Sequence, residues 1–210
     1  MKTSTDISTL ERNLCAVYAR ATAADKRDGS LWYPKAQDIM RSWSEAYGVT
    51  RETAACVTAA ISPQCDWERN LIIADDILAG RLPSVGGALP ANVRKAQLIL
   101  NRRVPTGFDS VFGMMREVFP GGPKVTHFAL NLCGHMDAIT IDTHCIQAAW
   151  NSPEITITLP WQRYMKVAIA YEHAAQRFGM RSATFQSVIW HAWKSLYPWN
   201  TKKRVRRQYV

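Results

Sequence analysis

The sequence predicts an all-α fold. Apolar residues recur every three or four positions through most of the chain, as in Leu10, Leu14 and Val17, and this spacing is typical of amphipathic helices. Short segments rich in Gly and Pro separate the periodic stretches. Only residues 155–159 and 138–141 resemble extended segments. We therefore expect helices joined by short loops.

Capping and breaking residues place the helices along the chain. Pro34 suits the first turn of a helix, because its missing N–H is not needed there. Thr50 and Asp66 are N-cap candidates, and the pair Ser62-Pro63 ends the helix between them. The predicted helices span residues 9–23, 34–47, 54–61, 66–79, 91–101, 109–118, 124–132, 142–150, 160–178 and 182–196.

The length of 210 residues is enough for one globular domain with a real core. We expect a single helical domain over residues 1–200, built as two lobes. The Gly/Pro-rich segment 82–90 is the clearest loop, so the division between lobes is predicted there. Residues 201–210 form a separate basic tail.

The chain is basic, with a net charge of +9 at pH 7. Five of these charges come from the tail, which contains no acid: Lys202, Lys203, Arg204, Arg206 and Arg207. Such a tail binds polyanions without reading sequence. A terminus that only improves solubility is an equally good interpretation.

Composition indicates a reduced intracellular compartment. The five cysteines are odd in number and show no CxxC spacing. The N-terminus is polar, unlike a secretory signal, and no apolar run approaches the roughly 20 residues that span a bilayer. We expect a cytoplasmic monomer that does not bind a membrane. The eight tryptophans serve equally well as core residues or as surfaces that stack on bases.

The strongest chemical signal is a lysine followed by an aspartate. Phe-Pro-Gly-Gly-Pro-Lys124 opens a predicted helix, and Ile-Thr-Ile-Asp142-Thr-His144 opens the next, 18 residues later. A neutral lysine attacks an electrophilic sugar carbon, and a nearby carboxylate stabilises the positive charge that develops there. With the basic charge, this pattern favours an enzyme acting on nucleic acid.

These two blocks resemble the helix-hairpin-helix DNA glycosylases of the endonuclease III-like superfamily. A second block, Ser62-Pro63-Gln64 with Trp67, is similar to the Ser-x-Gln stretch of that superfamily. The wider pattern also looks like glycosylase-like proteins of actinobacterial phages. The resemblance implies a two-lobed helical fold, double-stranded DNA as partner, and cleavage of the bond between a flipped base and its sugar.

The resemblance also implies a role for each matching residue. Lys124 would be the nucleophile and Asp142 its electrostatic partner, with AP-lyase activity as a consequence of the covalent intermediate. Gln64 would enter the space left by the flipped nucleotide, with Trp67 behind it. The remaining DNA contacts would come from the hairpin, the helix after it and the tail, through Gly121, Gly122, His144, Lys202, Lys203 and Arg204.

The hairpin departs from the family pattern. Gly121-Gly122-Pro123 is one residue tighter than usual, and Pro123 lacks an N–H that could have bound phosphate. No cysteine follows Cys145, so the iron–sulfur cluster of some relatives is not expected. We expect no cofactor. We expect no metal either, because the His, Asp and Cys residues between 135 and 145 lack a ligand spacing.

Other interpretations remain open at each position. Asp142 alone is typical of an N-cap, Lys124 of a solvated first-turn residue or phosphate contact, and Gln64 of an ordinary turn. Two rival functions remain as well. One is an enzyme on the same scaffold that adds groups to modified bases of phage DNA, and the other is a DNA-binding protein without catalysis.

Overall fold

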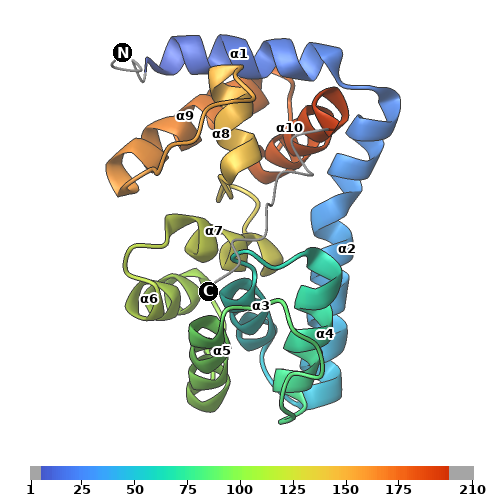
Figure 1. The fold of residues 1–210 in the computed structure, drawn as a ribbon, viewed down its shortest axis with the longest axis vertical. Helices are drawn as coiled ribbons and strands as arrows, with labels where there is room; N and C mark the ends of the chain where they lie inside the picture. Colours follow the sequence, from blue (N-terminus) through green and yellow to red (C-terminus); the bar gives the residue numbers. More distant parts are fainter. Residues whose placement is uncertain (1–5, 199–210) are drawn as a thin grey trace, which may run out of the picture. The chain divides into compact units, whose positions relative to one another are not determined.

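The all-α prediction is confirmed. A computed structural model describes residues 6–198, which form helices and no strand (Figure 1). The helices are α1 (Ile7–Arg20), α2 (Ala23–Tyr47), α3 (Arg51–Ile61), α4 (Trp67–Leu78), α5 (Pro90–Arg102), α6 (Phe108–Val118), α7 (Pro123–Leu132), α8 (Thr143–Trp150), α9 (Trp161–Arg177) and α10 (Ser182–Leu196). Within this part of the chain, none is long and apolar enough to cross a membrane.

Side-chain caps begin three of these helices where the sequence predicts them. The side chains of Thr50, Asp66 and Asp142 each accept a hydrogen bond from the backbone N–H three residues further on. Each bond satisfies one of the donors that a helix start leaves without a partner. These local signals therefore place α3, α4 and α8.

The predicted start of the second helix at Pro34 is wrong. Pro34 lies inside α2, which begins at Ala23. The start is fixed by a reciprocal pair: the Asp25 carboxylate accepts from the Thr22 N–H at 2.9 Å, and the Thr22 hydroxyl accepts from the Asp25 N–H at 3.1 Å. This is the arrangement of a capping box, and it outweighs the hydrogen bond that a proline removes from a helix interior.

The chain divides into two compact units: unit 1 comprises Met1–Trp32 and Ile141–Val210, and unit 2 comprises Tyr33–Thr140. The loop at residues 82–90, where the sequence predicts the division, lies inside unit 2. It joins α4 to α5, and both of these helices pack with α3. The Asp76 carboxylate holds the loop by accepting from the Ser84 N–H at 2.7 Å. A loop within one unit therefore explains this segment better than a boundary between units does.

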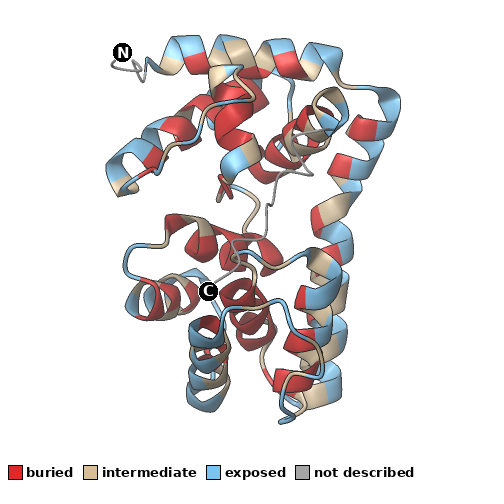
Figure 2. Cartoon of the chain, in the orientation of Figure 1, coloured by how far each residue is buried: buried red, intermediate tan, exposed pale blue. Residues whose placement is uncertain are grey.

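Unit 2 is built around α3. Every residue of α3 from Glu52 to Ile61 is buried, and Figure 2 shows the helix buried along its length. It packs against α4, α5, α6 and α7. A helix that is buried on all sides needs such a central position.

Unit 1 packs α1, α8, α9 and α10 against one another. Its largest fully buried side chains are aromatic: Tyr164, Tyr171, Phe185 and Trp193. The aromatic residues of the last two helices thus serve mainly as core. Gly29 of α2 permits a close approach to α10, because a Cβ there would lie 2.6 Å from the Cα of Val188.

Residues 138–141 and 155–159, which look extended in the sequence, do not pair as strands in the described chain. The first of these segments is held by side chains of α7 instead. Asn131 donates its amide to the Ala138 carbonyl at 2.7 Å and accepts from the Thr140 hydroxyl at 2.7 Å. The Nδ1 atom of the buried His127 lies 3.0 Å from the Ile139 carbonyl oxygen. These bonds fix the segment that leads from α7 towards Asp142.

Candidate active site

The hairpin that precedes Lys124 is a tight turn between α6 and α7, which pack against each other. The Gly122 N–H donates to the Phe119 carbonyl at 2.9 Å, and the Arg116 guanidinium donates to the Pro120 carbonyl at 2.9 Å. A Cβ on Gly122 would lie 3.1 Å from the Cβ of Phe119, whereas Gly121 faces open space. A tight turn therefore joins two packed helices, and Gly121 is its accessible glycine.

Lys124 is the second residue of α7, as the sequence predicts for a lysine that opens the helix. Pro123 takes the first position, where a missing N–H costs little. The Lys124 side chain is partly exposed. Within residues 6–198 its amine has no hydrogen-bond or ion-pair partner. It is therefore available to a ligand.

Gln64 lies in a strained turn between α3 and α4. The Cys65 N–H closes the turn on the Ser62 carbonyl at 3.3 Å, and Gln64 has a φ of 63°. Few residues other than glycine adopt this left-handed conformation, which concentrates at functional sites. The Gln64 residue is exposed.

An aromatic contact links the Gln64 turn to the helix of Lys124. Trp67, the first residue of α4, meets Phe128 of α7 edge to face, with ring centroids 6.2 Å apart. Phe128 lies four residues after Lys124, and residues at this spacing share one face of a helix. Unit 2 thus brings two of the sequence blocks, the Gln64 turn and the Lys124 helix, into one neighbourhood.

Asp142 is the N-cap of α8 in unit 1, and both of its carboxylate oxygens accept hydrogen bonds. Oδ1 accepts from the Cys145 N–H at 2.9 Å, and Oδ2 accepts from Nε1 of Trp190 in α10 at 3.0 Å. The Asp142 residue is nevertheless partly exposed. Two fixed donors therefore orient the carboxylate. The N-cap interpretation is therefore correct.

Lys124 and Asp142 belong to different units, because unit 2 ends at Thr140 and unit 1 resumes at Ile141. The residues that the structure brings together are Gln64, Trp67 and the Lys124 helix in unit 2, and Asp142 with His144 in unit 1. The approach of Lys124 to Asp142 stays a prediction. Lys202, Lys203 and Arg204 of the predicted basic tail lie outside the described residues.

His144 contacts the Asp142 site through Trp190. Its ring meets the Trp190 ring edge to face, with centroids 6.1 Å apart. The Nδ1 atom of His144 is buried and has no hydrogen-bond partner within residues 6–198. His144 thus packs against the residue that orients Asp142.

The structure adds residues of α10 that sequence reasoning missed. Trp190 donates to Asp142, and the Lys194 amine lies 4.0 Å from the centroid of the Trp190 ring. Burial lowers the pKa of Lys194, although the nearby Asp142 carboxylate raises it. Burial also lowers the pKa of His191. In the sequence these residues differ from the core only in their position on the predicted helix. The core residue Trp193 lies on the same helix, so this position did not identify a site.

No group of three or more His, Cys, Asp or Glu side chains that could hold a metal ion occurs within residues 6–198. The buried cysteines of the region are poor ligands as thiols, since burial raises the pKa of Cys133 to about 12 and also raises that of Cys145. The Cys145 sulfur instead accepts from the Gln186 amide at 3.1 Å.

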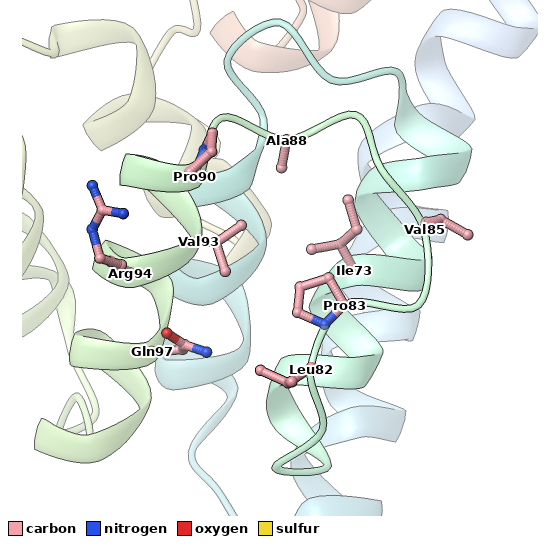
Figure 3. A pocket seen from close by; sticks show the side chains of 9 residues that line it. All are labelled: Ile73, Leu82, Pro83, Val85, Ala88, Pro90, Val93, Arg94 and Gln97. Carbon is pink, nitrogen blue, oxygen red and sulfur yellow. The ribbon is translucent and has the colours of Figure 1, made fainter.

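A pocket of about 350 Å³ lies between α4, α5 and the loop that joins them (Figure 3). Its lining is mostly apolar: Ile73, Leu82, Pro83, Val85, Ala88, Pro90, Val93, Arg94 and Gln97. The Arg94 side chain points away from the apolar groups in Figure 3. Ligand sites usually add several convergent polar groups to such a lining. The pocket therefore has few polar groups that could orient a ligand or take part in a reaction.

Comparison with protein families gives one assignment. Residues 1–196 match the model of a family described as a family of unknown function, DUF7178. The chain belongs to that family, and the match covers both units except the last residues of unit 1. No curated protein and no solved structure matches the chain.

Proposed function

We propose that this DUF7178 protein is a DNA base-excision glycosylase that acts on a flipped damaged or modified base of double-stranded DNA. The observation that carries the proposal is the Trp67–Phe128 contact, which joins the strained Gln64 turn to the helix that Lys124 opens. A wedge and a nucleophile must act on the same nucleotide, so they must lie in one neighbourhood. The hairpin context and the oriented Asp142 carboxylate add support.

The mechanism follows from the chemistry of the two side chains. Breaking an N-glycosidic bond leaves positive charge on the sugar, which the Asp142 carboxylate would stabilise. The neutral amine of Lys124 would attack C1′ as the base departs with the bonding electron pair. Loss of a proton from nitrogen and opening of the sugar ring then give a Schiff base, from which strand cleavage follows. The enzyme would thus combine glycosylase and AP-lyase activities.

The orientation of Asp142 matters for this role. Its two donors, the Cys145 N–H and the Trp190 indole, hold the carboxylate in one orientation. A fixed charge stabilises a developing cation better than one that must reorganise. Extruding the base costs a few kcal/mol, and Gln64 would offset part of this cost by filling the gap in the duplex.

Borohydride trapping tests the proposal. The protein is incubated with duplexes that carry an abasic site, uracil, oxidised guanine or 5-hydroxymethyluracil, and adducts are resolved on a denaturing gel. We expect a covalent adduct with the wild type and none with Lys124→Ala or Lys124→Arg. Lys95→Ala is the matched control, because Lys95 lies in the same unit over the Phe119 ring beside the hairpin.

The rival functions give different results in the same experiment. An enzyme that adds groups to modified bases would alter the DNA without releasing free base. A DNA-binding protein without catalysis would bind in a strongly salt-dependent manner, and Lys124→Ala would cost no more than one lost charge. Either result would overturn base excision. The proposed enzyme acts as a cytoplasmic monomer and needs no cofactor.

A further inference from the structure

We propose that Lys194 is a second reactive amine, which condenses with the aldehyde of a ring-opened deoxyribose beside Asp142. The inference rests on the proposed function only for the class of sugar. Three residues of unit 1 carry it: Asp142, Trp190 and Lys194. They come from two helices that pack against each other, α8 and α10.

The geometry places the amine near a carboxylate without pairing the two. Lys194 Nζ lies 4.0 Å from the centroid of the Trp190 ring, and the same ring donates its N–H to Oδ2 of Asp142 at 3.0 Å. No ion pair within 4.0 Å joins Lys194 to an acid among residues 6–198. The ring thus supports the amine and orients the carboxylate at the same time.

Burial makes the neutral, nucleophilic form of Lys194 easier to reach than in a fully exposed lysine. Burial lowers the pKa of the half-buried Lys194 side chain, and this effect exceeds the opposing attraction of Asp142. The other titratable groups nearby are His191, one turn earlier on α10, and His144, which contacts Trp190. The carboxylates of Asp28 and Asp25 in α2 raise the pKa of His191, against the larger effect of burial. Lys194, Trp190 and Asp142 are all partly exposed, so a small aldehyde reaches them.

The reaction is a balanced condensation. The nitrogen lone pair of Lys194 attacks the aldehyde carbon, forming a C–N bond, and the carbonyl oxygen takes up a proton. Loss of water from the resulting carbinolamine gives a protonated imine. This imine carries a positive charge, which the Asp142 carboxylate stabilises without having to reorient.

Lys26 provides a matched control within the same unit. Its amine lies 4.5 Å from the centroid of the Tyr18 ring, so it also has a cation–π contact. The Tyr18 ring belongs to α1 and, unlike Trp190, makes no hydrogen bond to a carboxylate within residues 6–198. Because both lysines have an aromatic contact, a difference in reactivity between them reports on the burial of Lys194 and on the nearby Asp142 carboxylate.

The test uses 2-deoxyribose 5-phosphate with cyanoborohydride, which reduces the imine to a stable secondary amine. Peptide mass spectrometry then measures labelling at each lysine of the full chain. Each unit of pKa depression gives about tenfold more free amine near neutral pH. We expect severalfold more label on Lys194 than on Lys26 at pH 7. As the pH is raised, labelling of Lys194 should begin to increase at a lower pH than labelling of Lys26. Equal labelling of the two lysines would overturn the inference.

The abasic duplex separates this inference from base excision. Peptide mapping of the trapped adduct is compared for the wild type, Lys194→Arg and Lys26→Arg, and thermal unfolding confirms that each variant folds. Label on Lys194 with the sugar but no adduct with any duplex would retain the inference and reject the glycosylase. An adduct on Lys124 alone, with Lys194 no more reactive than Lys26, would do the opposite.

Discussion

The indole N–H of Trp190 donates to Oδ2 of Asp142 at 3.0 Å, which links the start of α8 to α10. This bond orients the carboxylate that the sequence singled out, and no pattern in the sequence indicated it. It also gives Asp142 a structural role besides the cap of α8. Structural and catalytic roles therefore have to be separated by matched substitutions.

Trp190→Phe should lower the free energy of unfolding by about 1–2 kcal/mol, since it removes a charge-assisted hydrogen bond to the Asp142 carboxylate while it keeps most of the ring. Urea denaturation measures the change. Trp150→Phe is the control, because its indole N–H is buried with no hydrogen-bond partner in residues 6–198. We expect little loss from Trp150→Phe. Equal losses from both variants would show that ring shape, not the Asp142 bond, matters.

Asp142→Asn should separate the cap from the charge. Asparagine caps helices about as well as aspartate, so stability should fall by less than about 1 kcal/mol, whereas base excision should fall at least 100-fold. Asp66→Asn makes the same change at the N-cap of α4 and should leave excision unchanged. The two variants are compared by single-turnover release of free base. Retention of activity by Asp142→Asn would reduce Asp142 to a helix cap.

Gly29→Ala should destabilise unit 1 by about 1–3 kcal/mol, because the added methyl would lie 2.6 Å from the backbone of Val188. Gly113→Ala is the matched control within a helix. A Cβ at Gly113 meets nothing within 4 Å, and this change should stabilise the protein by about 0.4–1 kcal/mol. Thermal unfolding should move in opposite directions for the two variants. A neutral Gly29→Ala would mean that α2 and α10 shift apart without cost.

Gln64→Gly should keep or raise stability, because glycine adopts the φ of 63° without the roughly 1 kcal/mol that a side chain costs in this region. If Gln64 is the wedge, the same variant should excise bases more slowly from a duplex than from a single strand, which needs no extrusion. The ratio of the two rates is the measurement. An unchanged ratio would assign Gln64 to the turn alone.

Stability should fall as the pH drops below about 6.5, where unfolded histidine takes up a proton. Burial lowers the pKa of His127, so the native state resists this proton while the unfolded state binds it. His191 acts in the same direction. The loss of stability begins as the pH falls below the pKa of histidine in the unfolded state. It is complete once the pH lies below the lowered pKa of His127 in the folded state. Urea midpoints at pH 7.5 and 5.5 should differ less in His127→Gln than in the wild type.

Local residues explain how much of the fold the sequence could predict. The caps Thr50, Asp66 and Asp142 act within three residues, so their helices begin where expected. The predicted helix start at Pro34 was wrong because the Thr22–Asp25 pair starts α2 earlier. The stabilisation by this pair exceeds the local cost of a proline in the helix. The loop at residues 82–90 looked like a boundary between lobes because composition reports flexibility, not which helices pack together.

Residues close together in the chain were enough to predict the helical fold, most helix ends, the turn before Lys124 and the cap at Asp142. The contacts between side chains of different helices became known only from the packing of the helices. This packing placed Trp67 on Phe128 in unit 2, and Trp190 with Lys194 beside Asp142 in unit 1. The hydrogen bond between Trp190 and Asp142 joins residues 48 positions apart through the packing of α8 on α10. Helical periodicity marks a buried face, but the partner of that face is chosen by the whole core.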